Sequence, residues 1–252
     1  MKSYHLLLAA GFLPAALLQA NLASLALPGT SEFDAWENLS NTNAQVAAAA
    51  ATTDTSDDFP SFPGSGPWPT ALLPDAVGSA GNAGFNKLSG NGYTSTEAIY
   101  NFPGFAPPAN PGDYSVDNGA PLAGLETVVF QIDVGEGNGF FDAAPILSIN
   151  SGASQFAPDF TSTSAGRSFD NPQDPTETLT STVFAYQWDL SSAGAITDYS
   201  VQWGSAAHST IYAMQLDSGD SFVQVVPEPS AFAVIAGTLA LGLVAARRRR
   251  LR

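Results

Sequence analysis

Residues 127–134 constrain the fold most, because apolar and polar side chains alternate there with a period of two. One face of this stretch carries four apolar side chains, those of Val128, Phe130, Ile132 and Val134. Such alternation is typical of a half-buried β-strand. The same pattern recurs in three later stretches, residues 183–190, 196–203 and 209–217, and residues 145–150 form a shorter candidate strand.

Turn-forming residues separate these stretches at intervals of about 8 to 12 residues, the spacing of antiparallel β-proteins. No segment before residue 231 keeps the period of 3.6 that marks an amphipathic helix. We therefore expect an all-β fold, an antiparallel β-sandwich of jelly-roll or lectin-like type. Residues 91–226 are expected to form its body. Residues 27–90, broken by prolines and glycines, predict an irregular or linker-like segment, with membership of the sandwich left open. Within it, residues 32–36 could add a short edge strand or a helix.

The N-terminal residues 1–26 predict a secretory signal peptide. Lys2 supplies one positive charge, and an apolar run follows over residues 6–18. This run is shorter than the ~20 apolar residues that span a bilayer. Small residues allow cleavage after Ala20 or after Ala26. Export by a translocon and cleavage by signal peptidase are the expected consequences.

The C-terminal residues 227–252 predict a transmembrane helix with a basic tail. Residues 231–246 carry no charge, and five arginines follow them: Arg247, Arg248, Arg249, Arg250 and Arg252. Long arginine side chains can reach the interface from a short helix. Basic residues stay on the cytoplasmic side, so the tail is expected inside the cell and the body outside. Both ends of the chain thus predict the same location for the body.

Three residues before the apolar run, Pro227, Glu228 and Pro229, complete a known pattern. A Pro-Glu-Pro triplet, an apolar helix and a terminal arginine cluster resemble the PEP-CTERM sorting signal of Gram-negative bacteria. The resemblance covers residues 226–252 and the accompanying signal peptide. It implies a transient stay in the inner membrane with the body in the periplasm, then cleavage by an exosortase. The cell surface or the extracellular matrix is the implied destination, with exopolysaccharide as an implied partner.

Residues 27–226 are strongly acidic. They hold two basic residues, Lys87 and Arg167, and all but one of the chain's 23 acidic residues. Such a charge repels phosphate backbones, so nucleic acid is not an expected partner. The chain has no cysteine, which excludes disulfides, thiolate metal sites and thiol nucleophiles. Only His208 remains after loss of the signal peptide, too few histidines for a multi-histidine metal centre.

Residues 133–142 are the one stretch that suggests a metal. Four oxygen-bearing side chains lie there among glycines: Asp133, Glu136, Asn138 and Asp142. Calcium prefers six to eight such ligands, although this spacing departs from that of an EF-hand loop. The alternative is a strand end followed by a glycine-rich hairpin loop, and we weigh this reading above a calcium site. No other cofactor is expected.

Other candidate residues favour a structural role. His208 lies at the start of a strand without a Gly-x-Ser-x-Gly motif anywhere in the chain, so a hydrogen-bonded strand-end residue is expected rather than a catalytic base. Asp189, Asp198 and Asp217 are expected on outward faces or strand ends, as solvated charges. Three loop aromatics, Trp36, Trp68 and Tyr93, suit either sugar stacking or plugging the ends of the sandwich.

These observations favour a non-enzymatic surface or matrix protein whose β-sandwich binds polysaccharide. No catalytic residue is assigned. The alternative is a secreted carbohydrate-active enzyme on a lectin-like sandwich, since the many acidic residues offer carboxylate pairs whose separation the sequence does not define. A structural envelope protein without a ligand is a third hypothesis.

Overall fold

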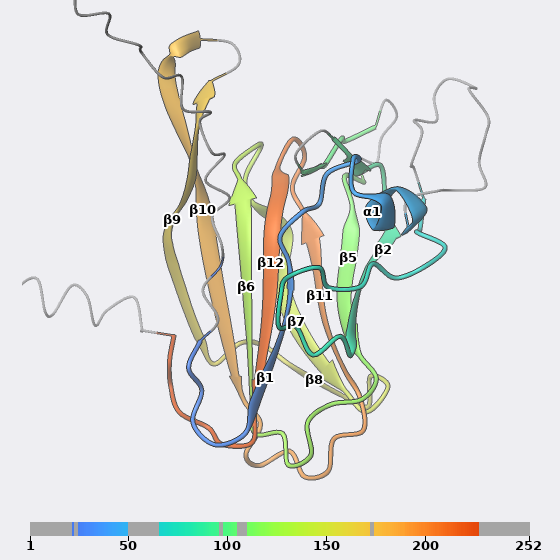
Figure 1. Ribbon diagram of the computed structural model, residues 1–252, viewed down its shortest axis with the longest axis vertical. Helices are drawn as coiled ribbons and strands as arrows, with labels where there is room; N and C mark the ends of the chain where they lie inside the picture. Colours follow the sequence, from blue (N-terminus) through green and yellow to red (C-terminus); the bar gives the residue numbers. More distant parts are fainter. Residues whose placement is uncertain are drawn as a thin grey trace, which may run out of the picture.

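The computed structural model describes residues 22, 25–49, 66–95, 98–104, 110–171 and 174–226. Its strands form two antiparallel sheets (Figure 1). The elements are β1 (Ser31–Trp36), α1 (Ala44–Ala49), β2 (Ala83–Ser89), β3 (Tyr93–Thr94), β4 (Ile99–Tyr100), β5 (Asp113–Asn118), β6 (Thr127–Gly135), β7 (Phe141–Ile149), β8 (Ser154–Phe156), β9 (Phe160–Asn171), β10 (Asp174–Asp189), β11 (Tyr199–Ser205) and β12 (Thr210–Gly219). The predicted all-β antiparallel fold is confirmed.

The larger sheet, called sheet A here, has seven strands in the order β3-β4-β12-β6-β10-β9, and β1 pairs with β12 beside β4. Sheet B has five strands in the order β2-β5-β11-β7-β8. The β9–β10 hairpin extends beyond the other strands in Figure 1, because β10 pairs with β6 only from Thr182 to Asp189. Apart from β3–β4, β7–β8 and β9–β10, neighbouring strands are not consecutive in the chain, so long connections cross from one sheet to the other.

Aromatic side chains from both sheets fill the space between them. Phe130 of sheet A lies 5.1 Å from Trp203 of sheet B, measured between ring centroids. Trp203 also stacks on Phe85 at 6.0 Å, and Phe85 stacks on Tyr114 at 5.6 Å. Buried aromatic rings contribute large apolar areas, so this cluster is a main source of stability. It fixes how the two sheets face each other.

The outer face of sheet A is covered by the two ends of the folded body. Leu27 and Val226 pack on Val129, which points away from the main core. The side chain of Gln187 binds the C-terminal segment, because Oε1 accepts from the amides of Val225 and Val226 at 2.9 and 3.0 Å. The chain ends cover β6 around Val129, and the β9–β10 hairpin covers Asp133 through Gly166. β6 is therefore buried along its whole length rather than half-buried as its alternation predicts.

The expectation that Asp217 is a solvated charge is wrong. Its side chain is 1% exposed on the covered face of sheet A. Both carboxylate oxygens accept from Gln215 Nε2, at 3.0 and 2.9 Å, and Oδ1 also accepts from the amide of Leu25. Hydrogen bonds of this kind offset the cost of burying a carboxylate. The alternation placed Asp217 on the outer face correctly, but it carries no information about the segment that covers this face.

Residues 27–90, expected to be irregular or linker-like or else to join the sandwich, contribute a strand to each sheet. β1 pairs with β12 over six residues, and β2 pairs with β5. Residues Gly66, Trp68 and Leu72 continue sheet B beyond β2 through backbone hydrogen bonds. The sandwich therefore begins before residue 91.

Candidate functional site

The outward face of sheet B carries short polar side chains in register across four strands. One row runs from Gln155 on β8 through Ser148 and Ser200 to Asp117 on β5. These residues alternate with core residues such as Leu147 and Val201. A sheet with one face in the core leaves the other face to polar residues, so the strands themselves position this row.

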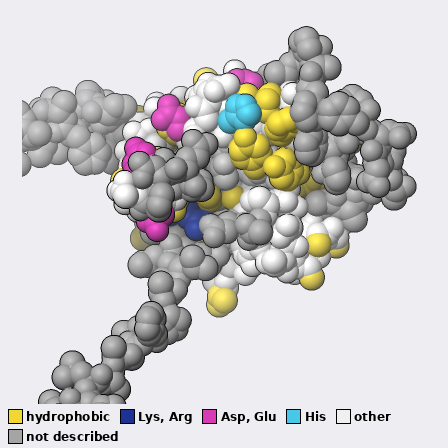
Figure 2. Space-filling view, turned by 90° about the horizontal axis from the view of Figure 1, so that it is seen from above, with side chains coloured by type: hydrophobic (Ala, Val, Ile, Leu, Met, Phe, Trp, Pro, Cys, Tyr) yellow, Lys and Arg dark blue, Asp and Glu magenta, His cyan; other side chains and the backbone are white. Residues whose placement is uncertain are grey.

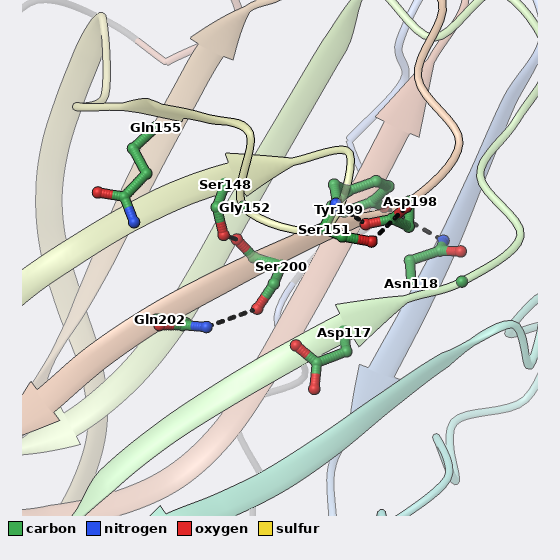
Figure 3. A pocket seen from close by; sticks show the side chains of 11 residues that line it. Asp117, Asn118, Ser148, Ser151, Gly152, Gln155, Asp198, Tyr199, Ser200 and Gln202 are labelled. Carbon is green, nitrogen blue, oxygen red and sulfur yellow. Dashed lines mark hydrogen bonds between the residues drawn. The ribbon is translucent and has the colours of Figure 1, made fainter.

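An open pocket of about 330 Å³ lies over this row, at the end where β5 and β7 finish and β11 starts. Its volume falls at the lower end of the range for small-molecule sites. Figure 3 shows its polar side chains on adjacent strands, with Ser151 and Asp198 together at one end. The lining residues are Asp117, Asn118, Gly119, Ser148, Ser151, Gly152, Gln155, Asp198, Tyr199, Ser200 and Gln202.

One rim of the pocket is the turn between β7 and β8, which has a strained backbone. Asn150, Ser151 and Gly152 follow one another with φ values of +53°, +57° and +84°. Side chains other than glycine rarely adopt this left-handed region. Strained residues of this kind persist only where the surrounding structure holds them, and they are concentrated at functional sites. The rim is therefore a built feature of the pocket.

Asp198 holds the rim in place. Its Oδ1 accepts from the amide of Ser151, and its backbone carbonyl accepts from the amide of Asn150 at 2.9 Å. Asn150 in turn accepts from the amide of Thr197 at 2.8 Å. The hydrogen bond from the Ser151 amide, followed by the one from the Thr197 hydroxyl, lowers the pKa of Asp198. Asp198 is thus a carboxylate with a positioning role.

Asp117 is the second carboxylate of the pocket. Its Oδ2 accepts from Asn86 Nδ2 at 2.8 Å and from Ser115 Oγ at 2.9 Å. Neither these two residues nor any other in the described ranges donates a hydrogen bond to Oδ1. Asp117 is therefore held in one orientation with an acceptor oxygen left over for a ligand.

Other polar groups of the pocket are weakly engaged within the protein. Gln202 Nε2 lies 3.4 Å from Ser200 Oγ, and Ser148 Oγ lies 3.4 Å from the carbonyl of Ser200. Hydrogen bonds of this length are weak, so a ligand can replace them at little cost. The side-chain amide of Gln155 bonds to no residue of the described ranges. Hydroxyl and amide groups are thus available to a ligand with many hydroxyls.

The residues suggested for calcium are dispersed by the fold. Asp133 is fully buried on β6, Asp142 is exposed on β7 in the other sheet, and Glu136 and Asn138 lie in the loop between these strands. Among the described residues, no three His, Cys, Asp or Glu side chains gather as a metal would require. Calcium at these four residues stays a prediction, and the pocket of sheet B contains none of them.

The glycines of this loop have a packing role. A Cβ on Gly137 would lie 2.2 Å from the backbone carbon of His208. Asn138 donates its amide to the carbonyl of Ala207 at 2.8 Å. Only glycine permits this approach, so close packing accounts for Gly137. The expected hairpin loop is wrong, because β6 and β7 belong to different sheets and this segment crosses from one sheet to the other.

The loop aromatics divide between the core and the surface. Trp36 and Trp68 are buried in the main core, as the plugging alternative expects. Tyr93 is half-buried on β3, where its ring lies 5.7 Å from that of Tyr100. His208 lies in the turn before β12 and hydrogen-bonds Tyr100 through Nδ1, in keeping with the expected strand-end role.

Sequence reasoning missed the residues of the pocket on β5. Asp113-Tyr114-Ser115-Val116-Asp117 alternates with period two and would have predicted this strand. The alternation in residues 196–203 did place Asp198, Ser200 and Gln202 on one face, but gave no sign of the rim beside them. Asp198 holds the rim from another loop, and no local sequence pattern predicts a contact between segments so far apart in the chain.

The predicted sorting residues Pro227, Glu228 and Pro229 and the five arginines lie outside the described residues, as does nearly all of the predicted signal peptide. In the described ranges no helix is both long and apolar enough to cross a membrane.

No protein-family model, curated protein or solved structure matches this chain. Function must therefore be inferred from its own residues.

Proposed function

We propose that this chain is an exported cell-surface or matrix protein that binds polysaccharide through the pocket of sheet B without cleaving it. The observation that carries the proposal is the rigid polar pocket itself. Serine hydroxyls, the amides of Gln155 and Gln202 and the oxygen of Asp117 match the hydroxyl-rich edge of a sugar. The jelly-roll or lectin-like class expected from the sequence belongs to the same proposal.

The ends of the chain support the route to the surface. The predicted signal peptide directs export, and the PEP-CTERM-like end directs membrane retention and then release by an exosortase. Contacts near the N-terminus favour cleavage after Ala20 over Ala26, because Leu25 donates its amide to Asp217 and packs beside Leu27. We expect the mature protein, purified from the culture or cell surface, to have an intact mass that begins at Asn21 and lacks the arginine tail. A mass that retains both ends would contradict this route.

Binding is tested best at Asp117. A glycan array probed with the mature body should identify polysaccharides, and titration calorimetry with the strongest of them should give a dissociation constant. Asp117→Asn keeps the side-chain shape but weakens the acceptor at Oδ1, so we expect at least tenfold weaker binding. Asp113→Asn is the matched control. It lies on the same face of β5 outside the pocket, where it accepts from Ser89 Oγ.

One observation favours the alternative, a carbohydrate-active enzyme. Asp117 and Asp198 both line the pocket, and glycoside hydrolysis uses two carboxyl groups. The general acid of such a pair needs a raised pKa, whereas hydrogen bonds lower that of Asp198. Asp198 is therefore a poor general acid. The proposed binding function leads us to expect no reducing sugar from any polysaccharide that binds. Turnover that disappears in Asp117→Asn would establish the enzyme, and equal affinity of wild type, Asp113→Asn and Asp117→Asn would refute the pocket.

A further inference from the structure

Four ring side chains gather at the end of the sandwich opposite the pocket. We call Tyr93, Tyr100, Phe102 and His208 the aromatic platform. Ring centroids lie 5.7 Å apart for Tyr93 and Tyr100, 5.9 Å for Tyr100 and His208, and 6.5 Å for Phe102 and His208. Figure 2 looks onto this end and shows the histidine beside a group of hydrophobic side chains on the surface. His208 is exposed and the other three residues are half-buried.

The platform rests on a buried polar anchor. Asn101, between Tyr100 and Phe102, is fully buried. Its amide donates to the carbonyl of Ser209 at 2.9 Å, and its side chain donates to Ser209 Oγ at 3.1 Å. Tyr114 Oη donates to Asn101 Oδ1 at 2.7 Å. A buried and satisfied network of this kind fixes the two neighbouring rings in position.

His208 is held in an unfavourable backbone conformation. Its φ is +67°, in the left-handed region. Its amide donates to the carbonyl of Asn101 at 2.7 Å, and Gly137 packs directly against its backbone. Non-glycine residues in this region cost of order 1 kcal/mol and more, and such strain is concentrated at binding sites. Placing the His208 imidazole ring at this point of the surface therefore lowers the stability of the fold.

We propose that the aromatic platform is a second carbohydrate subsite, so that one molecule links two polysaccharide chains. This inference rests on the proposed function of the pocket and adds a second point of attachment. A protein with two subsites would act as a cross-linker of a matrix, whereas one subsite would only coat a polysaccharide.

The chemistry of the platform suits a sugar ring. One face of a pyranose carries C–H groups, which pack favourably on the electron-rich faces of tyrosine and phenylalanine. The Tyr100 hydroxyl and His208 Nδ1 bond each other, which leaves His208 Nε2 and a second position on the Tyr100 oxygen for the hydroxyl groups at the ring edge. The rings are already ordered, so binding costs little conformational entropy. The acidic composition of the body disfavours an anionic ligand such as a nucleic acid.

The two subsites are too far apart to share a short ligand. β11 starts at Tyr199 beside the pocket and ends at Ser205, shortly before His208. At about 3.3 Å per residue, the strand separates the subsites by roughly 20 Å. A trisaccharide cannot reach from one to the other, so its binding stoichiometry counts the subsites.

Titration calorimetry with three neutral trisaccharides, cellotriose, laminaritriose and maltotriose, tests this inference on the mature body. His208→Gly is the main variant, because glycine adopts a positive φ without strain while the imidazole is lost. We expect its melting temperature to match or exceed that of the wild type, which separates binding from folding. Tyr100→Ala tests the same platform from β4. Concentrations are chosen so that a pocket weakened at least tenfold by Asp117→Asn gives no measurable heat.

The inference requires two trisaccharides per wild-type molecule, one in His208→Gly, one in Asp117→Asn, and none in the double variant. Turbidity of a long polysaccharide solution should rise with wild type and stay flat with each single variant. One trisaccharide per wild-type molecule, lost in Asp117→Asn but retained in His208→Gly and Tyr100→Ala, would overturn the second subsite and leave the proposed pocket intact. If the wild type binds one trisaccharide and only the platform variants lose it, the pocket is not a binding site and the molecule has one subsite instead of two. No heat with any trisaccharide would overturn both.

Discussion

Lys87 shows how far a single residue can depart from its usual environment. It lies on β2 with 1% of its surface exposed, and its Nζ donates to the carbonyl of Gly92 at 2.6 Å. Burial lowers the pKa of Lys87 to about 8. A lysine in the unfolded chain has a pKa near 10.4. The buried amine therefore opposes folding at neutral pH and stops doing so once it loses its proton.

We predict that stability rises with pH between about 8 and 10. Over this range the unfolded chain binds more protons than the folded chain, so raising the pH favours folding. The rise should be on the order of 1–3 kcal/mol in the free energy of unfolding by urea. Lys87→Met should abolish the rise in the free energy of unfolding between about pH 8 and 10, even if it changes that free energy at every pH. Parallel pH profiles for wild type and variant would contradict the assignment.

Residues also mark the limit of what the sequence could predict about the site. The alternation placed Ser200 and Gln202 outward, and the pocket uses both. The left-handed turn at Asn150 and Ser151 had no local signal besides the following glycine, because Asp198 holds it from another loop. His208 was expected to be a hydrogen-bonded strand-end residue. Its ring neighbours, Tyr100 and Phe102, lie more than 100 residues earlier in the chain.

At the scale of elements, the period-two stretches were the reliable signal. Residues 127–134, 183–190, 196–203 and 209–217 each contain or overlap a strand, β6, β10, β11 or β12. The sequence left residues 32–36 open between a short edge strand and a helix, and β1 forms there. It did not define β2. Both short stretches gain stability only from their partners, β12 and β5. The first half of β10 was also missed, because it lies in the projecting hairpin and its residues are largely exposed and polar.

The segment that follows β12 is an element without regular structure, and Gln187 secures it. The Gln187 side chain accepts from the amides of Val225 and Val226 and donates to the carbonyl of Val223 at 2.7 Å. Three hydrogen bonds depend on one buried amide. This arrangement explains why residues 221–226 close the outer face of sheet A without forming a strand.

We predict that Gln187→Ala releases this segment. At about 0.5–1.5 kcal/mol for each lost hydrogen bond, the free energy of unfolding should fall by roughly 2–4 kcal/mol. Limited proteolysis, analysed by mass spectrometry, should then show faster cleavage near Val225 than in the wild type. Gln202→Ala is the control, since that glutamine is exposed on sheet B and makes only a 3.4 Å hydrogen bond. Equal cleavage rates in the two variants would show that packing of Val226 alone holds the segment.

For the molecule as a whole, the two sheets differ in what covers their outer faces. Sheet A buries part of its outer face under the chain ends, so β6 is an interior strand although its outward face carries Thr127, Gln131 and Asp133. Sheet B leaves its outer face to polar residues and to the pocket. Composition and alternation predicted two layers of this kind. Which layer would be covered depends on where the ends of the body run, and this is a long-range property.

The course of the chain ends has a consequence for orientation. Leu27 and Val226 both lie on the outer face of sheet A, while the pocket opens from the outer face of sheet B. A surface attached close behind Val226 would therefore adjoin the layer opposite the pocket. A tethered molecule would direct its pocket toward the surroundings from the moment it is attached, without a hinge or a long spacer.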